Sequence, residues 1–206
     1  MDRIYYYILA VDNGFAPCVD EGALTLAICK PGIRLHAGKD DWIIGISPKK
    51  DGHRLCYVAK ITRDPIPGQD YYTKEKFRKR GDRIYRFDGR KFSLRKRRRA
   101  HEEGDVEKDV GKFPAYQNAV VLMSSKFWYY GDNARIISHE EYPALNRQLN
   151  RLTQGYRVNH PPAVHKELIT LIRHVRRRKL GVHGNPRNPP RKESDHSKHT
   201  KRHELC

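Results

Sequence analysis

The sequence lacks the short motifs that mark the common catalytic and cofactor sites. It contains no P-loop, no GxGxxG turn, no HExxH helix and no GxSxG turn. Its four cysteines, Cys18, Cys29, Cys56 and Cys206, form no CxxC pair and belong to no nearby Cys/His set with zinc spacing. The sequence therefore predicts reduced, mostly buried thiols, no bound metal, no cofactor and no identifiable catalytic motif.

Long apolar runs are absent as well. No stretch of about 18 apolar residues occurs, which excludes a membrane-spanning helix. The N-terminal MDRIYYYILAVDNGF has no small-residue cleavage site and is typical of a first β-strand in a cytoplasmic protein. Hydrophobic residues make up 37% and the mean hydropathy is -0.86, yet 12 Tyr, 6 Phe and 2 Trp supply bulk for one core. We therefore expect one folded domain with appendages.

Acidic residues are few relative to basic ones. The 206 residues include 42 Lys and Arg against 24 Asp and Glu, a formal charge of +18. Such an excess predicts a polyanionic partner, because each phosphate that a cation neutralises releases condensed counterions. We expect DNA or a nucleotide, with RNA also open, and no membrane; nothing predicts the oligomeric state. Residues 173–206 carry +8 of this charge, so the C-terminal part contributes almost half.

Four apolar runs of strand length occupy the first part of the chain, at residues 3–11, 23–29, 42–46 and 54–62. The last two flank a polar loop that contains Asp51-Gly52, which predicts a β-hairpin. A further strand is predicted at 118–124, followed at once by an aromatic run.

Helices are predicted at 71–80, 140–153 and 162–180, and in the last of these apolar residues recur at helical spacing. Residues 93–111 are charged and lack apolar periodicity, so we expect a loop there. From Gly181 onward almost nothing can be buried, which predicts a disordered basic tail. Strands first and helices afterwards favour an α+β domain with a curled, mostly antiparallel sheet.

Six stretches form a familiar combination: YYYILAVDNGFAP (5–17), TLAICKPGIR (25–34), DDWIIGI (40–46), RLCYVAKIT (54–62), GDRIY (81–85) and VVLMSSKFWYYG (120–131). Together they resemble nucleotide modification associated domain 2, a family linked to phage and bacterial DNA modification systems. The resemblance spans roughly residues 3–155 and has one departure. The family tends to show Gly-Asp-Trp where this chain has Asp40-Asp41-Trp42.

The hairpin that begins with DWIIGI also resembles part of the PUA-like barrels of the EVE and ASCH type, several of which hold a modified base between aromatic rings. These resemblances imply a PUA-like barrel in residues 1–160, a basic amphipathic helix at 161–180 and a disordered basic tail at 181–206. They also imply a domain that binds nucleotide or nucleic acid and recognises a modified or to-be-modified base.

The aromatic run from Phe127 to Tyr130 is the first candidate site. Because side chains alternate along a strand, Phe127 and Tyr129 share one side and the other two rings share the opposite side. One pair is expected to enter the core while the other faces out or lines a cleft. We predict that Trp128 and Tyr130 stack on a base together with Trp42. Aromatic packing on both faces is the alternative.

Polar turns supply the second candidate. Asp12 and Asn13 follow the first strand and Asp41 precedes the strand at 42–46, and their side chains can read the hydrogen-bonding edge of a base. The alternative is a turn capped by its own Asp, or a carboxylate that supports the hairpin. An enzyme that modifies a nucleotide, with Asp12 or Asp41 as general acid or base, is a further possibility. Nothing local orients a base beside Ser124 or Ser125, so a serine nucleophile paired with His101 or His139 is not predicted.

Basic runs supply the third candidate. The predicted phosphate-binding residues are consecutive in the loop: Arg95, Lys96, Arg97, Arg98 and Arg99. A solvated loop is the alternative. Residues 173–181 form a basic helix end, where cations also suit the helix dipole. A basic protein that coats nucleic acid without selectivity therefore remains an open interpretation.

Overall fold

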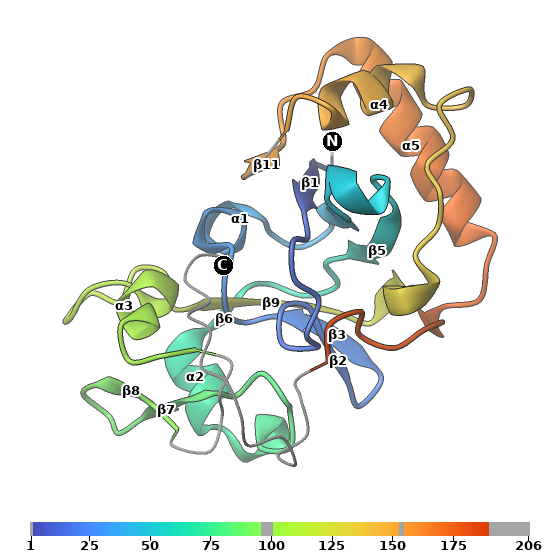
Figure 1. The fold of residues 1–206 in the computed structure, drawn as a ribbon. Helices are drawn as coiled ribbons and strands as arrows, with labels where there is room; N and C mark the ends of the chain where they lie inside the picture. Colours follow the sequence, from blue (N-terminus) through green and yellow to red (C-terminus); the bar gives the residue numbers. More distant parts are fainter. Residues whose placement is uncertain (1, 96–100, 153–154, 190–206) are drawn as a thin grey trace, which may run out of the picture.

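The computed structural model describes residues 2–95, 101–152 and 155–189, which fold around two β-sheets (Figure 1). Within these residues the larger sheet has six strands, in the order β11 (Tyr156–Arg157), β1 (Ile4–Ile8), β4 (Trp42–Ile46), β5 (Leu55–Lys60), β10 (Lys126–Tyr129) and β12 (Gly181–Val182). β4 and β5 form the predicted hairpin, with Trp42 opposite Lys60. β1 lies parallel to β4, and β12 lies parallel to β10.

The smaller sheet is antiparallel. In the described part of the chain its four strands are, in order, β2 (Cys18–Asp20), β3 (Ala23–Leu26), β9 (Val120–Ser124) and β6 (Ile66–Pro67). A separate hairpin is formed by β7 (Tyr85–Phe87) and β8 (Phe92–Leu94). The chain changes sheets at Ser124, whose Oγ lies 2.5 Å from the carbonyl oxygen of Lys60 and 2.9 Å from that of Lys126. This turn places the aromatic run in the larger sheet.

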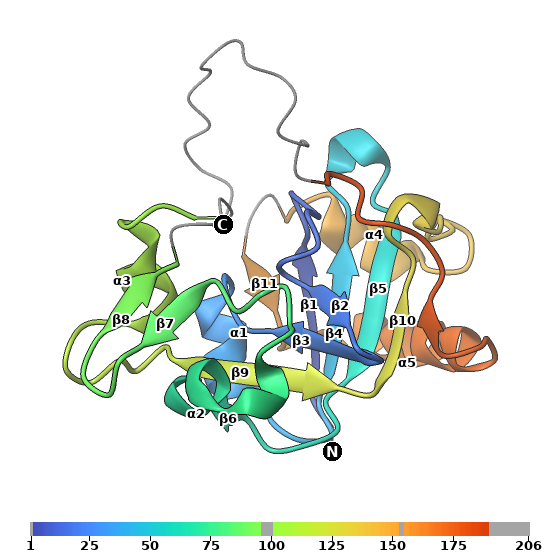
Figure 2. The same cartoon turned by 90° about the horizontal axis from the view of Figure 1, so that it is seen from below.

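Helices cover both sides of the larger sheet (Figure 1 and Figure 2). On the side of the smaller sheet lie α1 (Pro31–His36), α2 (Gly68–Thr73) and α3 (Asp105–Val110), and on the opposite side lie α4 (Pro143–Leu149) and α5 (Pro162–Arg176). The apolar stripe of α5 is buried against the sheet and consists of Val164, Leu168, Leu171, Ile172 and Val175. None of the helices in the described ranges has the length and apolarity needed to cross a membrane.

The larger sheet is buried on both faces, as its composition requires. All five residues of β1 are buried, and so are the first five of β5. The alternation predicted for the aromatic run is confirmed: Phe127 and Tyr129 pack in the core beside the smaller sheet, while Trp128 and Tyr130 pack with α5. Neither pair faces solvent, because each side of the sheet is covered by another layer.

The predicted PUA-like barrel is wrong. The structure is α+β with mixed sheets, but neither sheet closes, and β11 and β12 remain at the two edges of the larger one. Closure into a barrel pairs the two edge strands of a sheet with each other, and β11 and β12 are not paired here. The smaller sheet and the two C-terminal helices instead bury the two faces of the open sheet.

Two local predictions also differ from the structure. The segment 93–111, predicted as a loop, contains α3, whose Asp109 and Val110 are buried by tertiary contacts. The helix predicted at 71–80 is instead α2 followed by a 3₁₀ turn at Glu75–Phe77. Short elements such as these depend on packing more than on intrinsic propensity.

The predicted disordered tail is wrong for the part that the structure describes, residues 181–189. β12 pairs with β10, and the amide of His183 donates a hydrogen bond to the carbonyl of Tyr129 at 2.8 Å. Further along, the amide of Asn188 donates to the carbonyl of Asp12 at 2.7 Å. Backbone hydrogen bonds to a sheet edge thus fix a segment that has few apolar residues. Residues 190–206 lie outside the described residues.

Candidate functional site

The structure brings two of the predicted stacking residues together. The rings of Trp42 and Trp128 stack with centroids 6.5 Å apart and planes inclined by 18°. Trp42 is half-buried, whereas Trp128 is 5% exposed and its Nε1 donates to the carbonyl of Arg178 at 3.0 Å. The stack therefore lies where the end of α5 meets the larger sheet, with Trp42 as its exposed member.

Tyr130, the third predicted stacking residue, is completely buried. The ring of His183 stacks on it with centroids 5.2 Å apart, and the guanidinium of Arg135 lies 4.8 Å from its centroid. In this arrangement Tyr130 offers no free ring face to a base. Of the three rings, only Trp42 reaches the surface.

Cations surround the Trp42–Trp128 stack. Lys60 and Lys126 lie in register with Trp42 across β4, β5 and β10, so the three side chains share one face of the sheet. The Nζ of Lys60 lies 5.9 Å from the ring centroid of Trp42 and pairs with Asp40 at 3.0 Å. One end of the stack is therefore bordered by lysines.

At the other end of the stack, Trp128 contacts the backbone carbonyl of Arg178, which belongs to a group of arginines and one lysine. We call this group the α5 end cluster; it consists of Arg173, Arg176, Arg177, Arg178 and Lys179, all exposed. Among the described residues no carboxylate forms an ion pair with any of them. Their charges are therefore not neutralised within the described part of the fold.

Asp12 lies on the opposite side of the larger sheet from the stack. Its carboxylate is fully buried and accepts the hydroxyl hydrogen bond of Tyr129 at 2.8 and 2.9 Å to its two oxygens. Since Tyr129 and Trp128 are consecutive in β10, they point to opposite faces. The structure does not place Asp12 and the two tryptophans around one cavity. Burial raises the pKa of Asp12, and the hydrogen bond from Tyr129 opposes that rise.

The turn after β1 is occupied by the C-terminal segment of the chain. The amide of Asp12 donates to Oδ1 of Asn188 at 3.1 Å, and the amide of Arg187 lies 3.5 Å from Oδ2 of Asp12. Arg187 also pairs with Asp51 at 2.7 Å. Asn13 closes the turn itself, since its Oδ1 accepts from the amide of Phe15 at 3.1 Å. These contacts favour the structural interpretation of the turn.

Asp41 supports the start of the β4–β5 hairpin. Its carboxylate accepts from the amides of Arg3 at 2.8 Å and Gly38 at 2.9 Å, and it pairs with the guanidinium of Arg3 at 2.7 Å. Both oxygens are therefore engaged by the protein. The carboxylate fixes the N-terminus of β1 against the loop before β4.

Only the first residue of the predicted phosphate-binding loop is described. The Nε of Arg95 donates to the carbonyl of Tyr85 at 3.0 Å, which ties it to the β7–β8 hairpin. Lys96, Arg97, Arg98 and Arg99 lie outside the described residues.

A model of the family described as nucleotide modification associated domain 2 matches residues 1–193. The chain belongs to this family. Neither the curated proteins nor the solved structures contain a significant match. The family name associates the chain with nucleotide modification, in agreement with the resemblance seen in the sequence.

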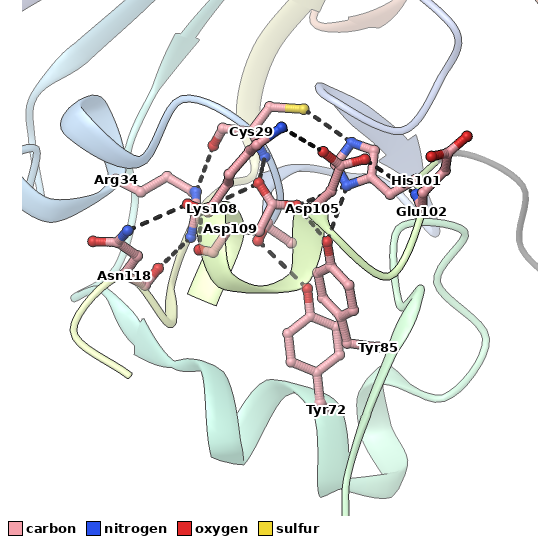
Figure 3. A network of polar contacts seen from close by, with 11 residues as sticks. Cys29, Arg34, Tyr72, Tyr85, His101, Glu102, Asp105, Lys108, Asp109 and Asn118 are labelled. Atoms are coloured by element: carbon pink, nitrogen blue, oxygen red, sulfur yellow. Dashed lines mark hydrogen bonds and ion pairs between the residues drawn. The ribbon is translucent and has the colours of Figure 1, made fainter. Parts of the chain in front are cut away.

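This nucleotide modification associated domain also contains a cluster that the sequence did not predict (Figure 3). We call it the Cys29 cluster: Cys29, Arg34, Tyr85, His101 and Asp109. The Sγ of Cys29 lies 3.4 Å from Nε2 of His101, and Nδ1 of His101 lies 2.9 Å from Oδ2 of Asp109. Tyr85 donates its hydroxyl hydrogen bond to the same carboxylate oxygen at 2.7 Å.

The second oxygen of Asp109 holds the backbone of Cys29. The amide of Cys29 donates to Oδ1 of Asp109 at 2.7 Å. Arg34, 1% exposed, lies 3.9 Å from the same oxygen, and its guanidinium is otherwise surrounded by carbonyl oxygens. Those carbonyls belong to Cys29, Asp109, Asn118 and Val120. Burial lowers the pKa of Arg34, and the charge of Asp109 opposes that shift.

The members of this cluster lie too far apart in the sequence to be recognised as one site. Cys29 precedes His101 by 72 positions, so no local spacing links them. The one local signal is the turn Cys29-Lys30-Pro31-Gly32 directly after an apolar strand, a place where a side chain is presented at the end of a sheet. Within the described residues no three His, Cys, Asp or Glu side chains are arranged to hold a metal ion.

Proposed function

We propose that this domain binds DNA or a nucleotide through a basic face formed by Trp42, Lys60, Lys126 and the α5 end cluster, as part of a nucleotide modification system. The observation that carries the proposal is the α5 end cluster, whose exposed cations have no ion-pair partner in the described residues and whose backbone, at the carbonyl of Arg178, contacts Trp128 of the Trp42–Trp128 stack. The family name supports the link with nucleotide modification.

The two parts of this face have different tasks. Cations bind phosphate and supply affinity without reading the base. The half-buried ring of Trp42, held in place by Trp128, supplies an apolar surface on which a base stacks, and this contact is where a modified or to-be-modified base is distinguished. Asp12, Asn13 and Asp41 shape the fold in this proposal.

A charge-removal experiment tests the phosphate contacts. The variant Arg176→Gln/Arg177→Gln/Lys179→Gln removes three cations that pair with no acid in the described ranges. A matched control removes three cations that are already paired with acids, Lys74→Gln/Arg78→Gln/Lys112→Gln. Binding to a labelled oligonucleotide is measured by fluorescence anisotropy at several salt concentrations. For the first variant we expect the log–log salt slope to fall by about 0.9 for each phosphate that its side chains no longer neutralise.

The same experiment can overturn the proposal. The control variant is expected to keep most of the salt dependence, since its cations are neutralised by the protein. An equal decrease in both variants would show that only net charge matters and that the α5 end cluster is not a binding face. No binding by the unaltered protein at low salt would reject the proposed function outright.

A ring-removal experiment tests the stacking contact. Trp42→Ala is expected to weaken binding to a single-stranded oligonucleotide by about 1–3 kcal/mol, while Trp42→Phe retains part of this free energy. The measurement compares oligonucleotides with unmodified and modified bases. If Trp42→Ala and Trp42→Phe bind all of them as the unaltered protein does, the ring takes no part in recognition.

A further inference from the structure

We propose that Cys29, His101 and Asp109 form a thiol catalytic site for acyl transfer, in which the sulfur of Cys29 attacks the carbonyl carbon of an amide, ester or thioester. The site lies beside α1 and α3 (Figure 3). Cys29 and Tyr85 belong to the core on the opposite side of the larger sheet from the face around Trp42. The site is therefore independent of the nucleic-acid binding proposed above, and the two proposals fail separately.

The imidazole of His101 is placed between an acid and a thiol. Asp109 Oδ2 lies 2.9 Å from Nδ1, so the carboxylate favours the tautomer with the proton on that nitrogen. Nε2 then presents its lone pair to the Sγ of Cys29, 3.4 Å away. A nucleophile beside a base that is oriented by a third group is the arrangement that activates thiols and hydroxyls in acyl transfer.

The backbone at the nucleophile is held in an unfavourable conformation. Cys29 and Lys30 have φ angles of +54° and +47°, in the left-handed region that residues with a Cβ seldom adopt. Two contacts fix this turn: Asp109 accepts the amide of Cys29, and the Nε of Arg34 donates to its carbonyl at 2.7 Å. Strain of this kind is found at sites where a side chain must be presented in one orientation.

A backbone donor lies beside the nucleophile. The amide N–H of Lys30, the residue after Cys29, donates no hydrogen bond to any residue in the described ranges. In thiol and serine acyl transferases the amide that follows the nucleophile stabilises the negative charge on the carbonyl oxygen. The Lys30 amide is available for that charge.

The other described cysteines provide an internal comparison. Cys18 and Cys56 are 3% and 0% exposed, and burial raises the pKa of each thiol to about 12. The Sγ of Cys56 lies 3.6 Å from the guanidinium of Arg187, which stays protonated and cannot act as a general base. Cys29 and His101 are slightly more exposed, at 7% and 9%. Reactivity is therefore expected at Cys29 and not at the other two thiols.

The acylation step needs only Cys29, His101 and the substrate. The Cys29 S–H proton passes to Nε2 of His101 while the sulfur forms a C–S bond with the carbonyl carbon. The bond from that carbon to the leaving nitrogen, oxygen or sulfur then breaks, and His101 returns the proton to the leaving group. Water or another nucleophile next attacks the thioester, gives its proton to His101, and releases Cys29 as a thiol.

Several groups set the charge environment of this pair. The charged and titratable side chains that face it are Asp109 and Asp105 from α3, Arg34 from α1, Tyr85 from β7, Tyr72 from α2 and Tyr7 from β1. Burial raises the pKa of Tyr85, and the charge of Asp109 raises it further. The tyrosines therefore stay neutral. Asp109 and His101 are the groups that determine whether the thiol of Cys29 loses its proton.

An activated ester tests the proposal directly. The full chain carrying Cys206→Ser, which removes the thiol outside the described residues, is treated with p-nitrophenyl acetate. We expect release of p-nitrophenol that depends on Cys29, with the acetyl group found by mass spectrometry on the peptide that contains it. Cys29→Ala abolishes this release, whereas the matched Cys56→Ala and Cys18→Ala leave it unchanged. His101→Gln lowers the rate about 10²–10⁴-fold.

Asp109 is tested as a positioning residue. Asp109→Asn is expected to lower the acylation rate about 10²–10⁴-fold and to change its dependence on pH, because an amide no longer fixes the tautomer of His101. Circular dichroism confirms that each variant is folded. Two results would overturn the proposal. One is release of p-nitrophenol that persists in Cys29→Ala, and the other is a Cys29 that stays unmodified in the protein without that substitution. In either case the cluster serves only to hold α1 and α3 together. The second outcome needs no variant, so misfolding cannot obscure it.

Discussion

Two buried carboxylates on the same side of the larger sheet, those of Asp82 and Asp109, contact different kinds of side chain. Asp82, fully buried, accepts hydrogen bonds from Thr25 and Tyr71 and lies 3.8 Å from the guanidinium of Arg80. Burial raises the pKa of Asp82, and the charge of Arg80 acts against that rise. Asp109 instead faces the imidazole of His101, with its Oδ2 2.9 Å from Nδ1.

The groups around each carboxylate determine its role. Arg80 is further tied to the carbonyls of Cys18, Asp20 and Ala23, so the Asp82 group closes the ends of β2 and β3, and no imidazole contacts Asp82 among the described residues. The Asp109 group is also buried and has a comparable arginine, but it adds the imidazole of His101 beside the thiol of Cys29. A buried ion pair with permanent charges fixes a fold, whereas one that includes His and Cys can transfer protons.

The largest predicted effect on stability follows from a substitution of Asp82, the carboxylate that we assign a structural role. Asp82→Asn leaves the guanidinium of Arg80 buried without its countercharge, and we expect the free energy of unfolding to fall by about 3–5 kcal/mol. Urea unfolding measures the change. The exposed pair Asp70–Lys74 serves as the control, since Asp70→Asn is expected to lower stability by less than about 1 kcal/mol. Equal effects of the two variants would contradict the role assigned to Asp82.

One tyrosine contacts each of the two carboxylates, Tyr71 at Asp82 and Tyr85 at Asp109. Tyr71→Phe and Tyr85→Phe each remove a hydroxyl that donates to a buried carboxylate, and each is expected to destabilise the fold by about 1.5–3 kcal/mol. Only Tyr85→Phe is expected to shift the pH profile of Cys29 acylation, because the hydroxyl that it removes binds the oxygen of Asp109 that faces His101. A shift of the same size in Tyr71→Phe would mean that the two clusters are not distinct.

The smallest predicted effect concerns Asp12, a third buried carboxylate. An unfolded Asp has a pKa of about 3.9, and the pKa of Asp12 is raised in the folded protein. Between these two values the folded state binds more protons than the unfolded state, so the free energy of unfolding falls as pH rises through that window. Asp12→Asn is expected to lack this fall in urea unfolding measured across the window. The exposed Asp64→Asn keeps the profile of the unaltered protein; identical profiles for both variants would refute the assignment.

Features that depend on local pattern could be predicted from the sequence. The β4–β5 hairpin follows from two apolar runs around a Gly-containing turn, and α5 follows from apolar residues at helical spacing. The alternation of Phe127 to Tyr130 between two faces needs only the period of a strand. Features that depend on distant contacts could not be predicted. The parallel pairing of β1 with β4 and the open edges of the larger sheet are of this kind.

The candidate sites also divide into residues that a local sequence pattern indicates and residues that only distant contacts bring together. Trp42 and Trp128 belong to one predicted group and they stack, whereas no sequence pattern shows on which side of the sheet Asp12 lies. Cys29 and His101 come from segments far apart in the chain, and the interpretation of the cysteines as buried thiols offers no reason to connect them. Their contact depends on α3, a helix too short to be recognised by its periodicity.

The most direct test of the contrast between Asp109 and Asp82 is the rate at which iodoacetamide alkylates Cys29 as a function of pH, measured by mass spectrometry on the full chain. An imidazole partner predicts that the rate reaches its plateau below pH of about 8.5, the pKa of an ordinary cysteine, and that Asp109→Asn removes this early plateau. A rate that rises only above that pH, with the same profile in Asp109→Asn, would contradict the account.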